Sequence, residues 1–291
     1  AICFALLSAM CAQAVAATLY VLNNASQSNS LVGNSTRLAT IDTVTGVFTP
    51  VQTLLSGTAY VKDLAYNPTT GNFYTSGLVG TNSDLRTLTT AGVLSSSIGT
   101  ITKDPYAMWY NSSTGTLSIY NRTNNQVGTV NTTTAAFTST ASSSPAVDNI
   151  VGGRGATLGG VNYFINAQLS GTGPNSTFGS INLATGAQTA TGTGSIYQRM
   201  VLASDGVDLY GLVPTTTGTA ILYKINPTNG ALVSSVGVTA STGTVGPQFS
   251  GAAFAVVPEP STIALAVSGI AVLAAGMRRR KPSARAKTSA S

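Results

Sequence analysis

The chain has 291 residues, of which 43% are hydrophobic and only 8% are charged, and it contains two cysteines and no histidine. This length can bury a hydrophobic core in one or two domains. The absence of histidine excludes histidine-based catalytic triads, imidazole metal ligands and histidine general bases. Because carboxylates are also few, we expect neither a bound metal nor a cofactor.

The formal net charge of +6 comes from the C-terminal end of the chain. Six of the 14 basic residues lie after residue 277, and the remaining eight balance the eight acidic residues. These eight basic residues are scattered singly, whereas a nucleic-acid-binding protein needs a basic face that neutralises several phosphates. We therefore expect no nucleic-acid partner.

Residues 1–17 have the features of a secretory signal peptide. An apolar run over residues 2–9 is followed by Ala12-Gln-Ala14 and Ala14-Val-Ala16, which offer the small residues that signal peptidase reads. Both cysteines, Cys3 and Cys11, precede the predicted cut, so the mature protein would have no disulfide and no thiol nucleophile. A buried first strand or helix is the alternative interpretation.

Residues 18–257 consist of short β-rich runs separated by turns of glycine, asparagine, proline, serine and threonine. Two phrases alternate along them. The first, seen at residues 38–46, predicts a hairpin turn between adjacent strands, and the second, seen at residues 64–71, leads into an aromatic strand. The first phrase recurs at 88–92, 130–134, 181–186 and 225–230, and the second at 109–115, 155–160 and 201–206.

The aromatic strands define a repeat. They start at Leu19, Phe73, Ile119, Tyr163 and Leu209, and the last three intervals are 46, 44 and 46 residues. A period of about 40–50 residues with about four short strands per unit is typical of a β-propeller, in which each unit is one blade. The sequence therefore predicts an all-β body, a β-propeller of about five four-stranded blades.

The two ends of this body predict how the propeller closes. The first repeat opens with an aromatic strand and lacks a strand before it, while residues 249–254 have no aromatic strand after them. We expect the last strand to complete the first blade, which removes open sheet edges. The phrases resemble those of extracellular propellers with Tyr-Val-Thr-Asn-like and Asn-Pro-x-Thr-Gly-like blades. A pair of β-sandwiches or a β-helix is the alternative architecture, since short strands with regular turns also suit those folds.

Polar residues of varied type gather in the segments that lead into the first strand of each predicted blade. In a propeller these loops surround one mouth of the central channel, and binding sites commonly lie on loops. Aromatic rings with isolated Lys, Arg, Asp and Asn side chains suit a neutral or weakly charged sugar, and ordinary solvated loops are the alternative. The candidate ligand-binding residues are Tyr60, Lys62, Asp63, Asp104, Tyr106, Asp148, Asn149, Arg154, Tyr197, Arg199 and Gln248.

Nothing in the sequence demands an enzyme. Asp104 and Asp148 could perform glycoside chemistry only if the fold brought their carboxylates to about 5–10 Å. Asp205 and Asp208 flank a turn, where aspartate more commonly forms the turn than binds calcium. The sequence contains no phosphate-binding loop, nucleophile elbow or metal-ligand spacing, so we predict no catalytic residues and no metal ligands.

An uncharged apolar run over residues 261–277 is followed directly by four basic residues, Arg278 to Lys281. Its 17 residues meet the lower limit for a transmembrane helix. By the positive-inside rule the basic end lies in the cytoplasm, which puts the body on the outer side of the inner membrane. A buried C-terminal helix is the alternative, although such a helix would not normally end in consecutive cations.

Residues 258–291, with a Pro-Glu-Pro sequence, a short apolar helix and an arginine cluster, resemble the PEP-CTERM sorting signal. The resemblance implies recognition by an exosortase-type membrane protease in a Gram-negative bacterium, cleavage near Pro-Glu-Pro, and transfer to the cell surface or the exopolysaccharide matrix. Two prolines would hold the cleavage segment extended, where a protease can bind it. The residues that carry the resemblance are Pro258, Glu259, Pro260, Arg278, Arg279 and Arg280.

Together these features predict an exported, non-enzymatic protein of the cell surface or the exopolysaccharide matrix, with a structural or glycan-binding role. The inner membrane would hold the precursor transiently through residues 261–277. One alternative is an extracellular propeller enzyme acting on glycans. The other is a protein-binding adhesion module.

Overall fold

The computed structural model describes residues 17–24, 36–55, 60–79, 82–101, 105–143, 154–166, 176–215, 218–242, 245–246 and 248–256. Residues Ala17–Ala255 form one compact unit. Residues 1–16 of the predicted signal peptide (residues 1–17) and the segment from residue 257 onward lie outside the described residues, so their predicted boundaries stay predictions.

The described strands form five four-stranded units, which we call blades 1 to 5. Blade 1 contains β20 (Gln248–Val256), β1 (Ala17–Asn24), β2 (Thr36–Ile41) and β3 (Val47–Leu55). Blade 2 contains β4 (Tyr60–Asn67), β5 (Asn72–Val79), β6 (Asn82–Thr89) and β7 (Gly99–Ile101). Blade 3 contains β8 (Pro105–Asn111), β9 (Thr116–Asn121), β10 (Gln126–Val130) and β11 (Phe137–Ser142). Blade 4 contains β12 (Gly155–Leu158), β13 (Val161–Asn166), β14 (Thr177–Ile181) and β15 (Gln188–Thr193). Blade 5 contains β16 (Val201–Ser204), β17 (Leu209–Pro214), β18 (Ala220–Ile225) and β19 (Leu232–Ala240), and the short 3₁₀ helix η1 (Ser195–Arg199) precedes it.

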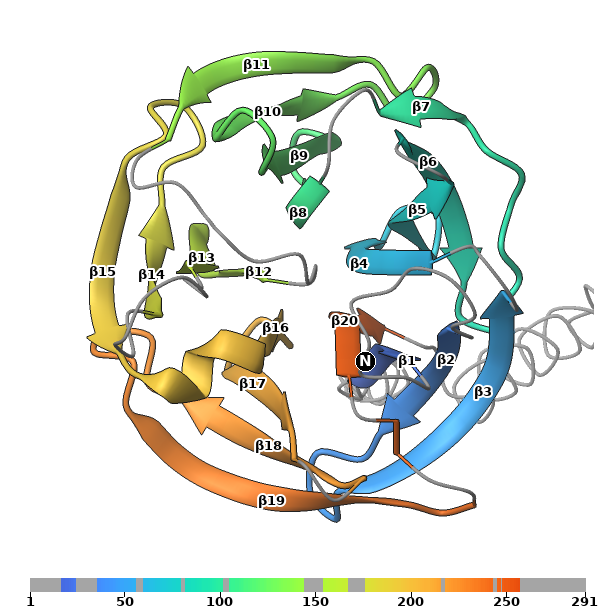
Figure 1. The fold of residues 1–291 in the computed structure, drawn as a ribbon, viewed down its shortest axis with the longest axis vertical. Coiled ribbons are helices and arrows are strands. Elements are labelled where there is room, and N and C mark those ends of the chain that lie inside the picture. Colours follow the sequence, from blue (N-terminus) through green and yellow to red (C-terminus); the bar gives the residue numbers. More distant parts are fainter. Residues whose placement is uncertain are drawn as a thin grey trace, which may run out of the picture. The chain divides into compact units, whose positions relative to one another are not determined.

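The blades stand in a ring around a common centre, with the first strand of each blade innermost and the fourth outermost (Figure 1). The predicted all-β propeller with about five four-stranded blades is confirmed. The last strand, β20, lies beside β1, so the predicted closure of the first blade is confirmed as well. A pair of sandwiches or a β-helix does not describe this arrangement.

Blades 5 and 1 are also joined at the outside of the ring. Strand β19 pairs with β3 in parallel through Thr239 opposite Val47 and Ala240 opposite Phe48, so the two blades share one eight-stranded sheet. The Thr239 amide donates to the Gly46 carbonyl oxygen at 3.1 Å. This pairing satisfies backbone groups of two outer strands that would otherwise be open edges.

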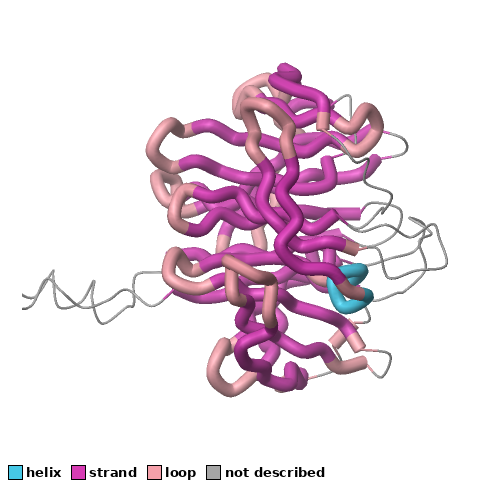
Figure 2. The backbone as a smooth tube through the Cα atoms, turned by 90° about the vertical axis from the view of Figure 1, so that its left-hand side faces the viewer, coloured by secondary structure: helices cyan, strands magenta, loops and turns pink. Residues whose placement is uncertain are grey.

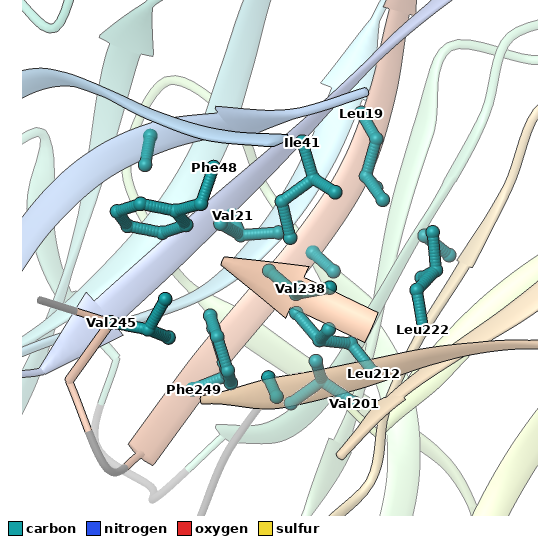
Figure 3. Close-up of a cluster of buried hydrophobic side chains, with 14 of the residues drawn as sticks. Leu19, Val21, Ile41, Phe48, Val201, Leu212, Leu222, Val238, Val245 and Phe249 are labelled. Atoms are coloured by element: carbon teal, nitrogen blue, oxygen red, sulfur yellow. The ribbon is translucent and has the colours of Figure 1, made fainter. Parts of the chain in front are cut away.

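The hydrophobic core lies between neighbouring blades, because alternate side chains of each strand face the blade before and the blade after. Figure 3 shows the cluster between blades 5 and 1, where Phe48 and Phe249 lie with Val201 and Leu212. Burying each such side chain contributes roughly 1.5–3 kcal/mol to stability. The same arrangement between blades 3 and 4 collects Tyr106, Trp109, Tyr120, Val127, Phe164 and Ile181.

The inner strands run between two faces of the body (Figure 2). The turns that join first and second strands lie on one face, which we call the turn face, and the described residues of η1 lie on the opposite face, which we call the loop face. The first-to-second turns of the turn face are residues 68–71, 112–115, 159–160 and 205–208, and the third-to-fourth turn at residues 42–46 lies beside Ala17 on the same face. The described parts of the loop face include residues 122–125 and η1.

The first sequence phrase forms the turn between the third and fourth strands of each blade, as predicted. In blade 1 the Asp42 carboxylate accepts hydrogen bonds of 2.8 Å from the amides of Val44 and Thr45, which lower the pKa of Asp42. The turn ends at Gly46 with φ of 73°, a left-handed conformation that favours glycine. Asn182 and Gly186 repeat the pattern in blade 4.

These turns also join neighbouring blades. A Cβ atom at Gly186 would overlap the Ser142 carbonyl oxygen at the end of β11 in blade 3. Two hydroxyl groups of blade 3 donate to this turn, Ser143 Oγ to the Gly186 carbonyl at 2.7 Å and Thr140 Oγ1 to the Leu183 carbonyl at 2.8 Å. The glycine is therefore required both by its φ angle and by the close approach of two blades.

Candidate functional site

The predicted ligand residues divide into three groups. Asp104, Asp148 and Asn149 lie outside the described residues, and Tyr60 begins β4 but its side chain is outside them too. Gln248 is half-buried and Arg199 is exposed on the loop face. The remaining candidates are buried: Lys62, Asp63, Tyr106, Arg154 and Tyr197.

Arg154 connects three blades at the loop face. Its side chain is fully buried directly before β12. Nη1 donates to the Tyr197 carbonyl oxygen at 2.7 Å and Nη2 donates to the Gln198 carbonyl oxygen, while the guanidinium lies 5.9 Å from the centroid of the Tyr106 ring. A buried cation is stable only where its N–H donors form hydrogen bonds, and here the carbonyl oxygens of η1 accept them. Arg154 thus fixes η1 to the inner strands of blades 3 and 4.

Tyr197 extends this connection to blade 5. Its hydroxyl donates to the Gly230 carbonyl oxygen at 2.7 Å, and burial raises the pKa of Tyr197. The ring also lies 5.9 Å from that of Phe178 in blade 4, centroid to centroid. The structure therefore brings Tyr106, Arg154 and Tyr197 together, and in the described residues their polar contacts are internal.

Lys62 and Asp63 lie in β4, where the pairing with β5 shifts its register. Asp63 has φ of 61°, which is uncommon for a residue other than glycine. Ser76 Oγ donates towards Asp63 Oδ2 at 3.4 Å and the Lys62 carbonyl at 3.2 Å. Gly251 of β20 packs on this backbone, since a Cβ there would lie 2.9 Å from the Asp63 carbonyl carbon. Such strain persists where the surrounding structure holds it, and it recurs at functional sites.

A second set of buried polar atoms was not expected from the sequence. Within the described residues, Ser83 Oγ, Asp84 Oδ1, Asn121 Nδ2 and Ser176 Oγ are buried without a hydrogen-bond partner. They lie at the connections between second and third strands, whereas the predicted ligand residues lie in the segments that lead into the first strand of each blade. A sequence signal for Asn121 exists: an asparagine ends the aromatic strand, and Asn24 and Asn166 occupy the same position in blades 1 and 4.

The acidic turn of blade 5 uses its carboxylates structurally. Asp205 Oδ1 accepts the amides of Val207 and Asp208 at 2.8 and 2.7 Å, and Asp208 pairs with Lys224 at 2.6 Å. Burial, together with the charges of Asp205 and Asp208, raises the pKa of Tyr210 to about 12. In the described residues, no group of three or more His, Cys, Asp or Glu side chains is arranged to hold a metal ion.

Among the described residues, blades 1 and 4 each contain a hollow, away from the predicted ligand residues. One of about 540 Å³ lies beside the start of β1 and is lined by Ala17, Asp42 and several threonines. The other, of about 110 Å³, lies beside Asn166, whose Nδ2 donates to Gln188 Oε1 at 3.1 Å. Only the first has a volume in the range of about 300–1,000 Å³ that small-molecule sites occupy.

No helix among the described residues is both long and apolar enough to cross a membrane, and the predicted helix at 261–277 lies outside them. Residues 256–281 match the model of the PEP-CTERM protein-sorting motif. This range contains the Pro-Glu-Pro sequence and the arginine cluster at residues 278–280.

No curated protein matches the chain. Among solved structures, the crystal structure of a nidogen/laminin complex is similar with 9% identity and a TM-score of 0.50, over 82% of this chain and 98% of that chain. TolB from Acinetobacter baumannii has 11% identity and a TM-score of 0.47, over 82% of this chain and 66% of its own, so this chain spans about two thirds of it. An endo-1,4-beta-xylanase from Bacteroides thetaiotaomicron has 12% identity and a TM-score of 0.48, over 78% and 91%. At these identities the likeness concerns the fold alone.

The motif and the fold agree with the two resemblances seen in the sequence. A PEP-CTERM signal belongs to exported proteins whose membrane-anchored precursors are processed by exosortase, a membrane protease. The chain is therefore an exported protein that carries a PEP-CTERM sorting motif on a β-propeller-like body.

Proposed function

We propose that the sorted body is a non-enzymatic component of the bacterial cell surface or the exopolysaccharide matrix, with a structural or glycan-binding role. The observation that carries the proposal is the PEP-CTERM motif at residues 256–281. By its resemblance, such a signal directs cleavage near Pro258 and delivery to the outside of a Gram-negative cell. The body that remains has a nearly balanced charge, and most of its turns are polar and uncharged.

The loop face is the binding end in this proposal. Arg199 and Gln248 are accessible there, and Arg199 belongs to η1, which the buried Arg154 holds in place. A rigid frame lowers the entropy cost of ligand binding, because fewer side chains and loops must be ordered. Planar guanidinium and amide groups give directional hydrogen bonds to sugar hydroxyls.

The first test follows the protein in its native host. Membrane, surface and medium fractions are separated, and both termini of the recovered protein are determined by mass spectrometry. We expect the surface or matrix fraction to contain a body that ends near Pro258. A full-length chain retained in the inner membrane would contradict sorting.

The second test measures binding of host exopolysaccharide to the recovered body by calorimetry. Arg199→Ala and Gln248→Ala should each weaken binding, whereas Val207→Ala, an exposed change on the turn face, should not. Release of new reducing ends from the polysaccharide would indicate the glycan-processing enzyme instead. Equal binding by all three variants would reject the loop face as the site.

A further inference from the structure

The two ends of the described body meet on the turn face. In blades 2 to 5 a short turn joins the first and second strands. In blade 1 these positions are taken by β20 and β1, which are neighbours in the sheet. The start of β20 lies beside the end of β1, because Asn23 Nδ2 donates to the carbonyl oxygens of Gly246 and Gln248 at 3.1 Å. The opposite ends of these two strands, Val256 and Ala17, therefore lie on the turn face, at the position where the other blades have the turn between their first and second strands.

The connection from the body to the predicted membrane helix is short. The sorting motif starts at residue 256, and the uncharged apolar run starts at Ser261. Five Cα steps separate Val256 from Ser261, which limits their separation to about 18 Å even in a fully extended chain. The headgroup layer of each leaflet takes up about 5–8 Å of this distance.

The point of attachment restricts tilting as well. Strand β20 is an innermost strand, and β3 on the outside of the same blade is three strand spacings away. At about 4.8 Å per spacing, the tether leaves the turn face well inside its rim. A short tether near the middle of a face holds that face, and no other, towards the membrane.

The turn face suits such a position chemically. Its first-to-second turns are two to four residues long and consist largely of Pro, Ser, Thr and Gly, as at residues 68–71 and 112–115. Val207 is 80% exposed and Val256 is 47% exposed. Among the described residues of this face, the charged side chains of the turns are those of Asp42, Asp205 and Asp208, and Asp208 is paired with Lys224.

We propose that in the membrane-anchored precursor the turn face lies against the lipid headgroups of the outer leaflet, so that the loop face points away from the membrane. The inference rests on the proposed function, because it requires the anchored precursor of the sorting pathway. Zwitterionic headgroups fit this face, since anionic lipids would repel Asp205. The tether, and not an affinity of the turns for lipid, holds the face in place, so cleavage releases the body.

The test places a fluorophore on single cysteines in the full chain, with Cys3→Ser and Cys11→Ser as background. The chain is reconstituted in phosphatidylethanolamine and phosphatidylcholine vesicles that contain lipid with a nitroxide on its headgroup. Thr70→Cys and Val207→Cys mark the turn face, and Thr123→Cys marks the loop face. Thr70 and Thr123 are matched, since both are exposed and their amides both donate to a preceding asparagine side chain.

We expect several-fold stronger quenching at Thr70→Cys and Val207→Cys than at Thr123→Cys. Inserting roughly 20 Gly/Ser residues after Val256, with an r.m.s. length of about 25 Å, should remove the difference. Equal quenching in the parent chain, or a difference that survives the insertion, would overturn the inference while leaving sorting intact. A full chain that does not float with the vesicles would instead overturn the anchored precursor, and the inference with it.

Discussion

The Ser250 hydroxyl donates a hydrogen bond of 2.9 Å to the main-chain carbonyl oxygen of Val61, from β20 in blade 1 to β4 in blade 2. Both residues are fully buried. Next to this bond, Gly251 packs on the backbone of Asp63. The last strand is therefore fixed to the following blade as well as to β1, and the ring is closed on both sides of β20.

Ser250→Ala should lower the free energy of unfolding by about 1–2 kcal/mol, because the variant loses a buried hydrogen bond. Urea unfolding followed by tyrosine fluorescence measures the change. Ser139→Ala in β11 is the control, since Ser139 is exposed and the change should stay within about 0.5 kcal/mol. Equal stability of the two variants would show that the bond does not contribute to closure.

Arg154→Met should lower the free energy of unfolding by about 2–4 kcal/mol, because it leaves the carbonyl oxygens of Tyr197 and Gln198 without these donors. Arg154→Lys should restore only part of the loss, since an ammonium lacks the planar fork that reaches two acceptors. Arg199→Met is the control, because Arg199 lies in η1, the 3₁₀ helix that Arg154 contacts, but is exposed. A loss as large for Arg199→Met would argue against Arg154 as the connection between blades.

Gly186→Ala and Gly71→Ala separate backbone strain from crowding. Both glycines have positive φ, 72° and 70°, so each substitution should cost about 1–2 kcal/mol for the left-handed conformation. A Cβ at Gly71 meets no atom within 4 Å, whereas one at Gly186 overlaps blade 3, which should add about 1–3 kcal/mol. Thermal unfolding measures both. Equal losses would show that the blades can move apart.

Blade 3 offers a natural comparison for this prediction. Ala135 occupies the corresponding turn position with φ of 60°, and the outer strand that it meets carries Gly99. In this pair of blades the glycine that permits the close approach lies in the strand, at Gly99, and not in the turn. Gly99→Ala should therefore destabilise the protein, because a Cβ there would lie 2.6 Å from the Thr134 carbonyl oxygen.

Alkaline pH should destabilise the body through Tyr210. Its pKa in the folded protein is about 12, which is above the value of about 10 in the unfolded chain. The folded state therefore holds the phenol proton more tightly, so this contribution to stability is present below about pH 10 and is lost as the pH rises towards 12.

Urea unfolding at about pH 9 and about pH 11.5 measures this loss. In Tyr210→Phe the loss should be smaller, with a remainder from Tyr20 and Tyr197, whose pKa values burial also raises. If the variant and the parent lose the same free energy between the two pH values, the phenol of Tyr210 does not contribute.

The fold could be predicted because its signals are local and repeated. An asparagine or aspartate followed by a glycine at a fixed spacing makes the same turn wherever it occurs, as at Asp42 and Asn182. The aromatic strands, at intervals of 44 to 54 residues, predicted the number of blades. The parallel pairing of Thr239 with Val47 had no such signal, since it depends on where two outer strands meet in space.

The candidate site could be predicted only in part. The sequence grouped Tyr106, Arg154 and Tyr197 because all three precede or begin inner strands, and the structure does bring them together. The sequence could not show that Arg154 and Tyr197 donate hydrogen bonds to main-chain carbonyl oxygens, or that the Arg154 guanidinium lies over the Tyr106 ring. Burial depends on contacts among three blades, which no local pattern records.

The sequence by itself determined that this protein is exported with a sorting motif and that its body is a repeat, because a sorting motif and a turn phrase are read from neighbouring residues. Only the tertiary structure decided which polar residues hold blades together, as Ser250 and Arg154 do, and which remain accessible, as Arg199 does. It also decided that Ala17 and Val256 stand together on the turn face. The contacts of β20 depend on ring closure, which brings together residues 189 to 223 positions apart. The burial of Arg154 depends on contacts between neighbouring blades, with a partner 43 positions away.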